Sequence, residues 1–429
     1  MRLLAKEETP LDWTSKKIGS YVLGHKGGAA LRPSDFSDVG FPVIPKKAIQ
    51  PTGELLIESP TYCTNEFASN NKRSIVDNSY TITTLRDLVP TGPTIGTVVN
   101  FTSEEKYILS QGVYGLKLND DLDKKYLSYL SNTSFYRKVM QRIMVGSTQV
   151  HIRTPEYLDL EIQIPPLLEQ QKIAKILSTW DRAISTTERL IDNSTQQKKA
   201  LMQQLLTGNK RLLDESGERF EGEWEEVKLG DLKLDISDGN YSAKYPKQAD
   251  FLDTGIPFLR ANNLDKGTIS DNDMRFISPK QHSEITKGHL KKGDILLSTR
   301  GELGNVALVP DRHIGSNINA QLVRINAKDK LSGKFLFQLF DYLRVTGKFE
   351  SLSTGTALKQ LPIGKLKILE FDLPLLIEEQ QKIATVLTNA DKEIELLEQQ
   401  LADLQQEKKA LMQVLLTGKK RVVVDEEDV

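Results

Sequence analysis

The sequence predicts an α/β (α+β) fold built by tandem duplication, in which two globular domains alternate with two long helices that pair as an antiparallel coiled coil. Three observations lead to this prediction. A stretch of 43 residues occurs twice, each copy carries apolar residues at heptad spacing, and the regions before the two copies share shorter motifs. Repetition within a chain constrains its architecture more strongly than local propensity does.

The repeated stretches are residues 169–211 and 379–421, which align without a gap and are identical at 23 of 43 positions. A short apolar stretch that contains proline precedes each copy. Apolar residues recur in both at alternating steps of four and three, which is the spacing of a coiled-coil seam. The seam residues are Ile173, Leu177, Trp180, Ile184 and Ile191 in the first copy, and Ile383, Leu387, Ile394, Leu397, Leu401 and Leu404 in the second.

Each copy is predicted to form one helix about 60 Å long, at about 1.5 Å per residue. Gly208 and Gly418, each followed by basic residues, are typical of helix C-termini. A single heptad helix is more often a dimerisation element or an ordinary core helix. Two copies in one chain can instead pair with each other, and Thr187 and Ser194 make the first seam weak enough to require the second as its partner. Antiparallel pairing predicts an internal pseudo-twofold axis.

The regions before the helices also correspond to each other. Residues 13–20 resemble 224–231, 36–43 resemble 251–258, 91–98 resemble 299–306, and 146–149 resemble 355–358. Strands are expected at Tyr80–Leu85, Gly293–Ser298, Val306–Val309, Gln321–Ile325 and Leu366–Phe371, and helices at Asp121–Leu130, Ser134–Ile143 and Ser332–Tyr342. The predicted parts are a first domain (1–163), a first spacer helix (164–212), a second domain (213–373), a second spacer helix (374–421) and an acidic tail (422–429).

Composition indicates a globular intracellular protein. The chain has 429 residues, 38% of them hydrophobic, and a net charge of −1. It has no apolar run long enough to span a membrane, and its charged N-terminus does not resemble a secretory signal. The single cysteine, Cys63, excludes an internal disulfide framework and a cysteine-based zinc site, and we expect it to be a buried apolar residue. These features predict a cytoplasmic protein that does not associate with membranes.

The repeated Glu-Gln-Gln-Lys-Ile-Ala starts at Glu169 and Glu379 and the paired Leu-Leu-Thr-Gly ends resemble the specificity subunit of type I restriction–modification enzymes. Residues 293–308 and 354–361 look like the recurring motifs of that family's target-recognition domains. The resemblance covers essentially the whole chain, although the first domain departs from the fuller motif at residues 89–99.

The resemblance implies a non-catalytic subunit in which each domain reads one half of a bipartite, asymmetric site in double-stranded DNA. It implies that the helices set the spacing between the half-sites and dock two modification (methyltransferase) subunits, which the restriction or translocase subunits join. The complex would direct adenine methylation and restriction. S-adenosylmethionine, ATP and Mg would belong to the partner subunits, and this chain itself would bind no cofactor and no metal.

Candidate DNA-binding residues lie in three kinds of position. Arg300 follows a predicted strand and could pair with guanine or a phosphate, or form a surface salt bridge. Arg260, Asn262 and Asn263 follow another strand, with Lys46 and Lys47 as approximate counterparts, and asparagines there could equally serve a turn. The small-residue loops with Ser147, Thr148 and Gln149, and with Thr356, Leu358 and Lys359, suit phosphate oxygens or a helix cap.

Two other classes of function remain open. One is an interaction scaffold without a DNA role, which would have identical or acidic domains. The other is a detached part of an enzyme, which would need a cluster of titratable groups in each domain. The sequence shows no phosphate-binding Gly-x-x-x-x-Gly-Lys-Ser/Thr loop, no methylase motif and no nuclease carboxylate cluster. Divergent domains beside nearly identical helices favour a reader of changing targets that has a constant partner.

Overall fold

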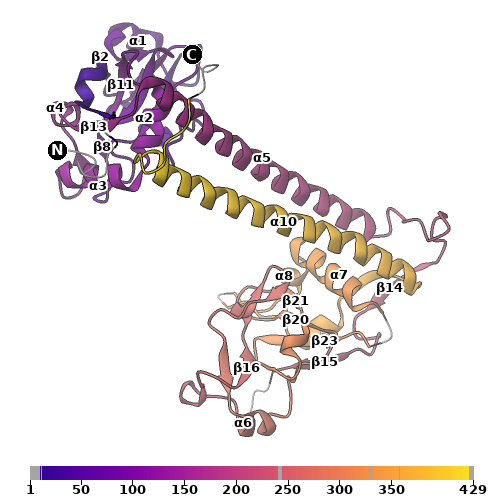
Figure 1. The fold of residues 1–429 in the computed structure, drawn as a ribbon. Helices are drawn as coiled ribbons and strands as arrows, with labels where there is room; N and C mark the ends of the chain where they lie inside the picture. Colours follow the sequence, from indigo (N-terminus) through magenta and orange to yellow (C-terminus); the bar gives the residue numbers. More distant parts are fainter. Residues whose placement is uncertain (1–9, 11, 240–243, 329–330, 357, 425–429) are drawn as a thin grey trace. The chain divides into compact units, whose positions relative to one another are not determined.

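The computed structural model describes residues 10, 12–239, 244–328, 331–356 and 358–424. The chain divides into two compact units (Figure 1). Unit 1 comprises residues up to Glu188 and from Gln400 onward, and unit 2 comprises Arg189–Gln399. Each unit therefore contains one globular head, the start of one long helix and the end of the other. We call residues 12–166 the first head and residues 209–376 the second head.

The first head is built mainly from short strands. Its strands are β1 (Thr14–Lys17), β2 (Val22–Gly27), β3 (Phe36–Ser37), β4 (Phe41–Ile44), β5 (Tyr62–Cys63), β6 (Ile75–Val76), β7 (Tyr80–Thr84), β8 (Arg86–Asp87), β9 (Val98–Asn100), β10 (Tyr107–Leu109), β11 (Val113–Leu118), β12 (Val150–His151) and β13 (Glu161–Ile164). Its helices are α1 (Asn65–Asn70), α2 (Lys124–Ser131), α3 (Ser134–Ile143) and α4 (Thr154–Leu158). The central sheet has the order β2-β11-β7-β9, and a second sheet has the order β3-β5-β4-β10-β6.

The second head repeats this plan. Its strands are β14 (Trp224–Lys228), β15 (Asp235–Asp238), β16 (Ile256–Leu259), β17 (Leu264–Asp265), β18 (Thr268–Ile269), β19 (Arg275–Ile277), β20 (Asp294–Ser298), β21 (Val306–Leu308), β22 (Asn317–Ile318), β23 (Leu322–Asn326) and β24 (Glu370–Pro374). Its helices are α6 (Pro279–Glu284), α7 (Gly333–Val345), α8 (Lys348–Leu352) and α9 (Ile363–Lys367). The sheet order β15-β23-β20-β21 matches the first head strand for strand.

The hydrogen-bond register makes this correspondence exact to the residue. Thr84 lies opposite Val113 in the first head, as Ser298 lies opposite Leu322 in the second. The parallel pair of β4 with β10 likewise corresponds to the pair of β16 with β22. The predicted duplication is therefore a duplication of topology as well as of helices.

Most predicted elements of the heads are present, but the segment Leu366–Phe371 differs. It was expected to form one strand, whereas the structure ends α9 at Lys367 and begins β24 at Glu370. The two ends of the apolar run belong to different elements. Leu366 lies on α9 and Phe371 on β24, and both side chains are buried in the core of the second head. A short apolar run does not by itself distinguish these cases.

The two long helices are α5 (Leu167–Leu205) and α10 (Ile377–Leu415), which lie within the predicted spacer segments. Unit 1 pairs the start of α5 with the end of α10, and unit 2 pairs the start of α10 with the end of α5, so the pairing is antiparallel. All eleven seam residues named above are buried or half-buried, Ile173, Leu177, Ile383 and Leu387 fully. The last residues of the predicted acidic tail, 425–429, lie outside the described residues.

The glycines after the helices have the left-handed conformation expected of C-caps. Gly208 has φ +70° and Gly418 has φ +73°. An added β-carbon would lie 3.2 Å from Trp224 at Gly208, and 2.5 Å from Pro10 at Gly418. The left-handed backbone therefore favours glycine at each helix end, and the close neighbours leave little room for a side chain.

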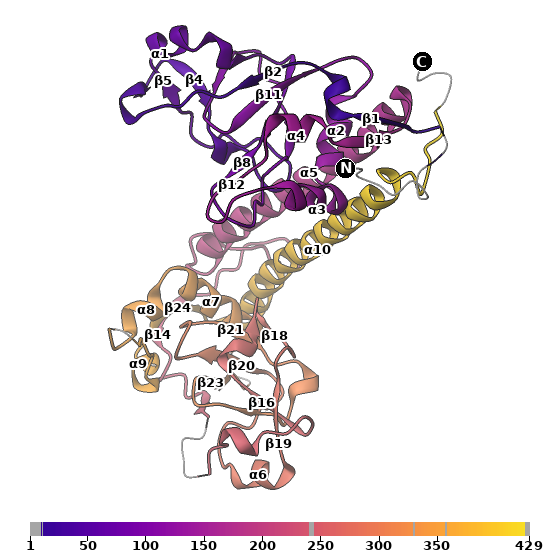
Figure 2. The same cartoon turned by 90° about the vertical axis from the view of Figure 1, so that its left-hand side faces the viewer.

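In each unit, the repeated Glu-Gln-Gln sequence at the start of the long helix makes hydrogen bonds that hold the head and the two helices together. Glu169 is almost fully buried and accepts hydrogen bonds from Arg421, and Glu379 accepts them in the same way from Arg211. The next residue, Gln170 or Gln380, accepts from the backbone N–H of Asp123 or Ser332, at the N-terminus of α2 or α7. In unit 2, α7 lies beside α10 in both views (Figures 1 and 2).

Candidate nucleic-acid interface

In the second head, three of the candidate segments are joined by backbone hydrogen bonds at one end of the central sheet. These are the 3-10 turn after β16, the residues after β20 and the loop 354–360. The bonds that join them run from Asn319 N to Leu259 O (2.8 Å), from Thr299 N to Gln321 O (2.7 Å) and from Leu361 N to Thr299 O (2.9 Å), with a bridge between Arg300 and Gln360. No local feature of the sequence indicates that Arg300 and the loop of Thr356, Leu358 and Lys359 are neighbours.

The first head contains the same chain of contacts. Its bonds run from Ser110 N to Ile44 O (3.1 Å), from Leu85 N to Gly112 O (3.3 Å) and from Ile152 N to Leu85 O (2.9 Å), and Arg86 lies opposite His151 in the pairing of β8 with β12. Each bond has its counterpart in the second head. The residue of the first head that corresponds to Arg300 is therefore Arg86.

The gapless alignment of residues 91–98 with 299–306 does not identify Arg86 as the counterpart of Arg300. It holds for the second half, where Gly96 corresponds to Gly304, and both glycines donate their N–H to the end of the preceding strand. Thirteen residues separate β7 from β9, however, whereas seven separate β20 from β21. The extra six residues lie after Arg86, so the gapless alignment set Gly92 against Arg300. The only signal available in the sequence was an arginine two residues beyond a strand end.

The longer connection of the first head is held by Asp87, which is 3% exposed. Its carboxylate accepts hydrogen bonds from the N–H and Oγ1 of Thr94 and from the N–H of Leu88. Lys46 adds an ion pair at 3.0 Å. Burial alone would raise the pKa of Asp87, but the hydrogen bonds from Thr94 and Lys46 outweigh it and hold the pKa below its ordinary value. Lys46 thus supports the loop that follows Arg86.

The 3-10 turns after β4 and β16 separate the remaining candidates into exposed and internal residues. Lys46–Ala48 corresponds to Ala261–Asn263, so Lys47 matches Asn262, and both side chains are exposed. Asn263 matches Ala48 and is fully buried.

Two of the predicted contacts in the second head are engaged within the protein. The Asn263 amide donates to Ser270 and Asn272 and accepts from the N–H of Arg260, so the prediction that it contacts DNA is corrected to the role in the turn. The Arg260 side chain is 25% exposed and forms an ion pair with Asp273 at 2.7 Å. Asparagine is favoured at such a position because its short amide can bond the neighbouring backbone.

The glycine loops are exposed at their tips. Gly146 has φ +121° and Gly355 has φ +90°, and an added β-carbon would clash with the backbone oxygen three residues later in either loop. The tips carry exposed side chains at Ser147, Thr148, Gln149, Thr356, Leu358 and Lys359, while Ala357 lies outside the described residues. Leu358 at the tip of the second loop is 88% exposed.

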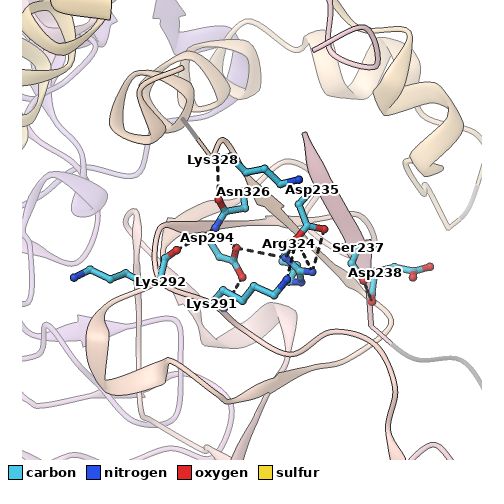
Figure 3. Close-up of polar contacts among 9 residues, drawn as sticks. All are labelled: Asp235, Ser237, Asp238, Lys291, Lys292, Asp294, Arg324, Asn326 and Lys328. Atoms are coloured by element: carbon cyan, nitrogen blue, oxygen red, sulfur yellow. Dashed lines mark hydrogen bonds and ion pairs between the residues drawn. The ribbon is translucent and has the colours of Figure 1, made fainter. Parts of the chain in front are cut away.

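The second head also contains a buried charge cluster that has no counterpart in the first head (Figure 3). Arg324, 8% exposed, pairs with Asp235 at 3.1 Å and lies 3.5 Å from the fully buried Asp294. Asn326 and the N–H of Lys291 donate to Asp294. Burial would raise the pKa of Asp235, but Lys291 and Arg324 hold it below its ordinary value.

Corresponding strand positions in the first head hold Gly115 and Tyr80 in place of Arg324 and Asp294. The charged groups of the cluster pair with one another, which indicates a structural role. The heads therefore share a backbone and differ both at the surface and inside.

Among the residues that the structure describes, no group of three or more His, Cys, Asp or Glu side chains is placed to hold a metal ion. In the described ranges, none of the helices combines the length and the apolar content needed to cross a bilayer. Cys63 is buried in the first head.

Comparison with known proteins gives a consistent result. The family model for the type I restriction modification DNA specificity domain matches twice, at residues 10–193 and 221–406. The MjaVIII type I restriction enzyme specificity subunit of Methanocaldococcus jannaschii is 28% identical over 328 residues, which cover 74% of this chain and 75% of the relative.

Two solved structures share the fold. The S subunit of a type I restriction–modification system from M. genitalium has a TM-score of 0.59 at 16% identity, with 95% of this chain and 98% of that chain covered. A chain from a study of assembly in the type I R-M system has a TM-score of 0.58 at 18% identity, with 96% and 99% covered. The chain belongs to the type I restriction–modification DNA specificity family, as a non-catalytic specificity subunit with two DNA recognition domains.

Proposed function

We propose that each head reads one half of a bipartite, asymmetric site in double-stranded DNA. The observation that carries the proposal is the pair of heads with one backbone and different exposed side chains at equivalent positions. The turn after the first parallel strand presents Lys47 in one head and Asn262 in the other. Lysine suits a phosphate or guanine, whereas asparagine suits adenine, so the same scaffold can serve two different half-sites.

The paired helices set the distance between the half-sites and dock two modification subunits. The support is their near identity, which contrasts with the divergent heads. Each unit repeats the same buried glutamate–arginine pair and the same glutamine cap. Repeated surfaces of this kind suit two identical partners, as in other assemblies with twofold symmetry.

The partner subunits supply the chemistry. S-adenosylmethionine, ATP and Mg bind to the modification and restriction subunits, and this chain contributes recognition and spacing in the cytoplasm, where bacterial and archaeal DNA lies. Restriction or translocase subunits join through the same core. The assembled complex directs adenine methylation and restriction to the site that the two heads read.

A methylation map tests this function. The chain is expressed with its modification subunit in bacteria that lack DNA methylation, and the modified bases are located by sequencing. One split motif, methylated in both halves and absent without this chain, is the expected result. A stable complex that methylates no motif would contradict the reader function and favour the scaffold alternative.

A further inference from the structure

We propose that Arg86 makes the DNA contact in the first head that Arg300 makes in the second, an inference that rests on the proposed function. The two residues occupy the same backbone position in their heads. Arg86 lies two residues beyond the end of β7, and Arg300 lies two residues beyond the end of β20. Each is paired with a residue that follows the exposed tip of the glycine loop in its head. The ligand is a pair of hydrogen-bond acceptors on double-stranded DNA, either the edge of a guanine or the oxygens of a phosphate.

The backbone at Arg86 is held firmly. Thr84 Oγ1 lies 2.8 Å from the carbonyl oxygen of Arg86 and 2.9 Å from that of Gly112, within reach to donate its one proton to either, and β8 pairs with β12. The arginine stem packs beside Gly112, where an added β-carbon would lie 3.2 Å from Arg86 Cβ. The side chain itself is exposed. A rigid backbone that presents an exposed guanidinium is the arrangement that accurate recognition requires.

The charge of Arg86 is not neutralised within the head. The neighbouring carboxylate, Asp87, points inward and is occupied by Thr94 and Lys46. Among the described residues, no acidic side chain forms an ion pair with Arg86, and His151 lies opposite it in the strand pairing. Lys46 forms its ion pair with Asp87, whereas the side chains of Lys47 and Arg86 are both exposed.

The alternative is an ordinary surface arginine without a function. Against it stands the divergence of the surrounding sheet, where Gly115 and Tyr80 replace Arg324 and Asp294. Both heads have arginine at this position, although other side chains of the neighbouring strands differ. We therefore assign the arginine to the function that the two heads share, which is DNA recognition. A guanidinium fork suits that task because it can meet two acceptors at once.

The test uses the complex of the full chain with its modification subunit. Arg86→Gln removes the charge, Arg86→Lys keeps the charge without the fork, and Arg300→Gln is the reciprocal variant. Lys117→Gln is the matched control, because Lys117 is exposed on the neighbouring strand opposite Tyr80, at the other end of β7. Each variant is measured by methylation mapping and by DNA affinity at several salt concentrations.

Arg86→Gln is expected to affect only one half-site, and Arg300→Gln only the other. For a guanine contact, one position of that half-site becomes tolerant of other bases, affinity for the site falls about 5- to 150-fold, and Arg86→Lys is also impaired. For a phosphate contact, affinity falls for all sequences, the salt slope decreases by about 1, and Arg86→Lys restores binding. Lys117→Gln leaves the map and the affinity unchanged.

Two results would overturn the inference while leaving the proposed function intact. One is an Arg86→Gln complex whose map and affinity equal those of the Lys117→Gln complex. The other is an equal loss in both half-sites, which would assign Arg86 to folding or assembly. A wild-type complex that methylates no motif would instead count against the proposed function itself.

Discussion

Lys198 of α5 lies 2.6 Å from Asp391 of α10, an ion pair that joins the two long helices within unit 2. Asp341 of the second head approaches the same ammonium group at 3.2 Å, and Gln338 donates to Asp391. Unit 1 repeats the arrangement, because Lys408 pairs with Asp181, which also accepts a hydrogen bond from the Tyr129 hydroxyl. A buried or half-buried polar pair between two helices disfavours other registers and orientations, because a shifted register would leave its charges unpaired.

Replacing Lys198 by Met should lower the stability of unit 2 by about 1–2 kcal/mol, because Asp341 and Asp391 lose their shared cation in a half-buried place. Lys198→Glu should cost more, and adding Asp391→Lys should recover part of the loss. Thermal unfolding of the full chain measures all three variants. Equal midpoints for Lys198→Glu with and without Asp391→Lys would argue against a pairing role.

Glu379→Gln should destabilise the attachment of the second head by about 2–3 kcal/mol. The carboxylate is fully buried and receives two hydrogen bonds from Arg211, which a neutral amide cannot match. The neighbouring Glu378 is exposed, so Glu378→Gln is the matched control and should cost less than about 0.5 kcal/mol. Denaturant unfolding compares the two variants, and similar losses would contradict the assignment.

Asp87→Asn should lower the stability of the first head by about 2 kcal/mol at pH 7, since the carboxylate receives hydrogen bonds from Thr94 and an ion pair from Lys46. The pKa of Asp87 is lower in the folded state than its ordinary value of 3.8. Its ionised form therefore contributes stability that is fully present above about pH 4 and is lost as the pH falls through the folded pKa.

The difference between wild type and Asp87→Asn should accordingly shrink below pH 4. Unfolding in urea between pH 3 and pH 7 measures it. A difference that stays constant over this range would mean that the charge of Asp87 does not hold the loop.

Arg324→Leu should cost about 3 kcal/mol, because it leaves the fully buried Asp294 without its nearest cationic side chain (Figure 3). Lys291→Met is the control within the same cluster. The Lys291 side chain is 60% exposed, so its pair with Asp235 should contribute less than about 1 kcal/mol. Urea unfolding, monitored by tryptophan fluorescence, measures the loss of stability in both variants. A loss for Arg324→Leu as small as that for Lys291→Met would show that Asp294 does not need the arginine.

Deletion of residues 186–192 together with 396–402 removes one matched heptad from each helix and leaves both lysine–aspartate pairs in place. Seven residues correspond to about 10 Å of helix, or about 3 base pairs of DNA. The unread spacer between the half-sites should shorten while the letters of each half stay unchanged. A methylation map of the variant complex measures this, and altered letters would argue against a spacer role for the helices.

The sequence by itself determined the architecture. The gapless repeat and its heptad spacing predict two paired helices, and the flanking motifs predict two related heads, because periodicity and repetition are local properties of a chain. Shared glycines were equally informative, since Gly40 and Gly255 both adopt positive φ in equivalent turns. Arg300 and Asn262 could be selected as candidates for the same reason, as each lies two or three residues beyond the end of a recognisable strand.

The tertiary structure alone decided which candidates face outward and which residues are equivalent. The side chains of Asn263 and Lys46 bind to other groups of the same head. For Lys46 that group is Asp87, which is distant in the sequence. Arg86 could be matched with Arg300 only through strand register, because an insertion of six residues hides the correspondence from any gapless comparison. Hydrogen-bond register is a property of two paired strands, so it cannot be read from the sequence of either strand alone.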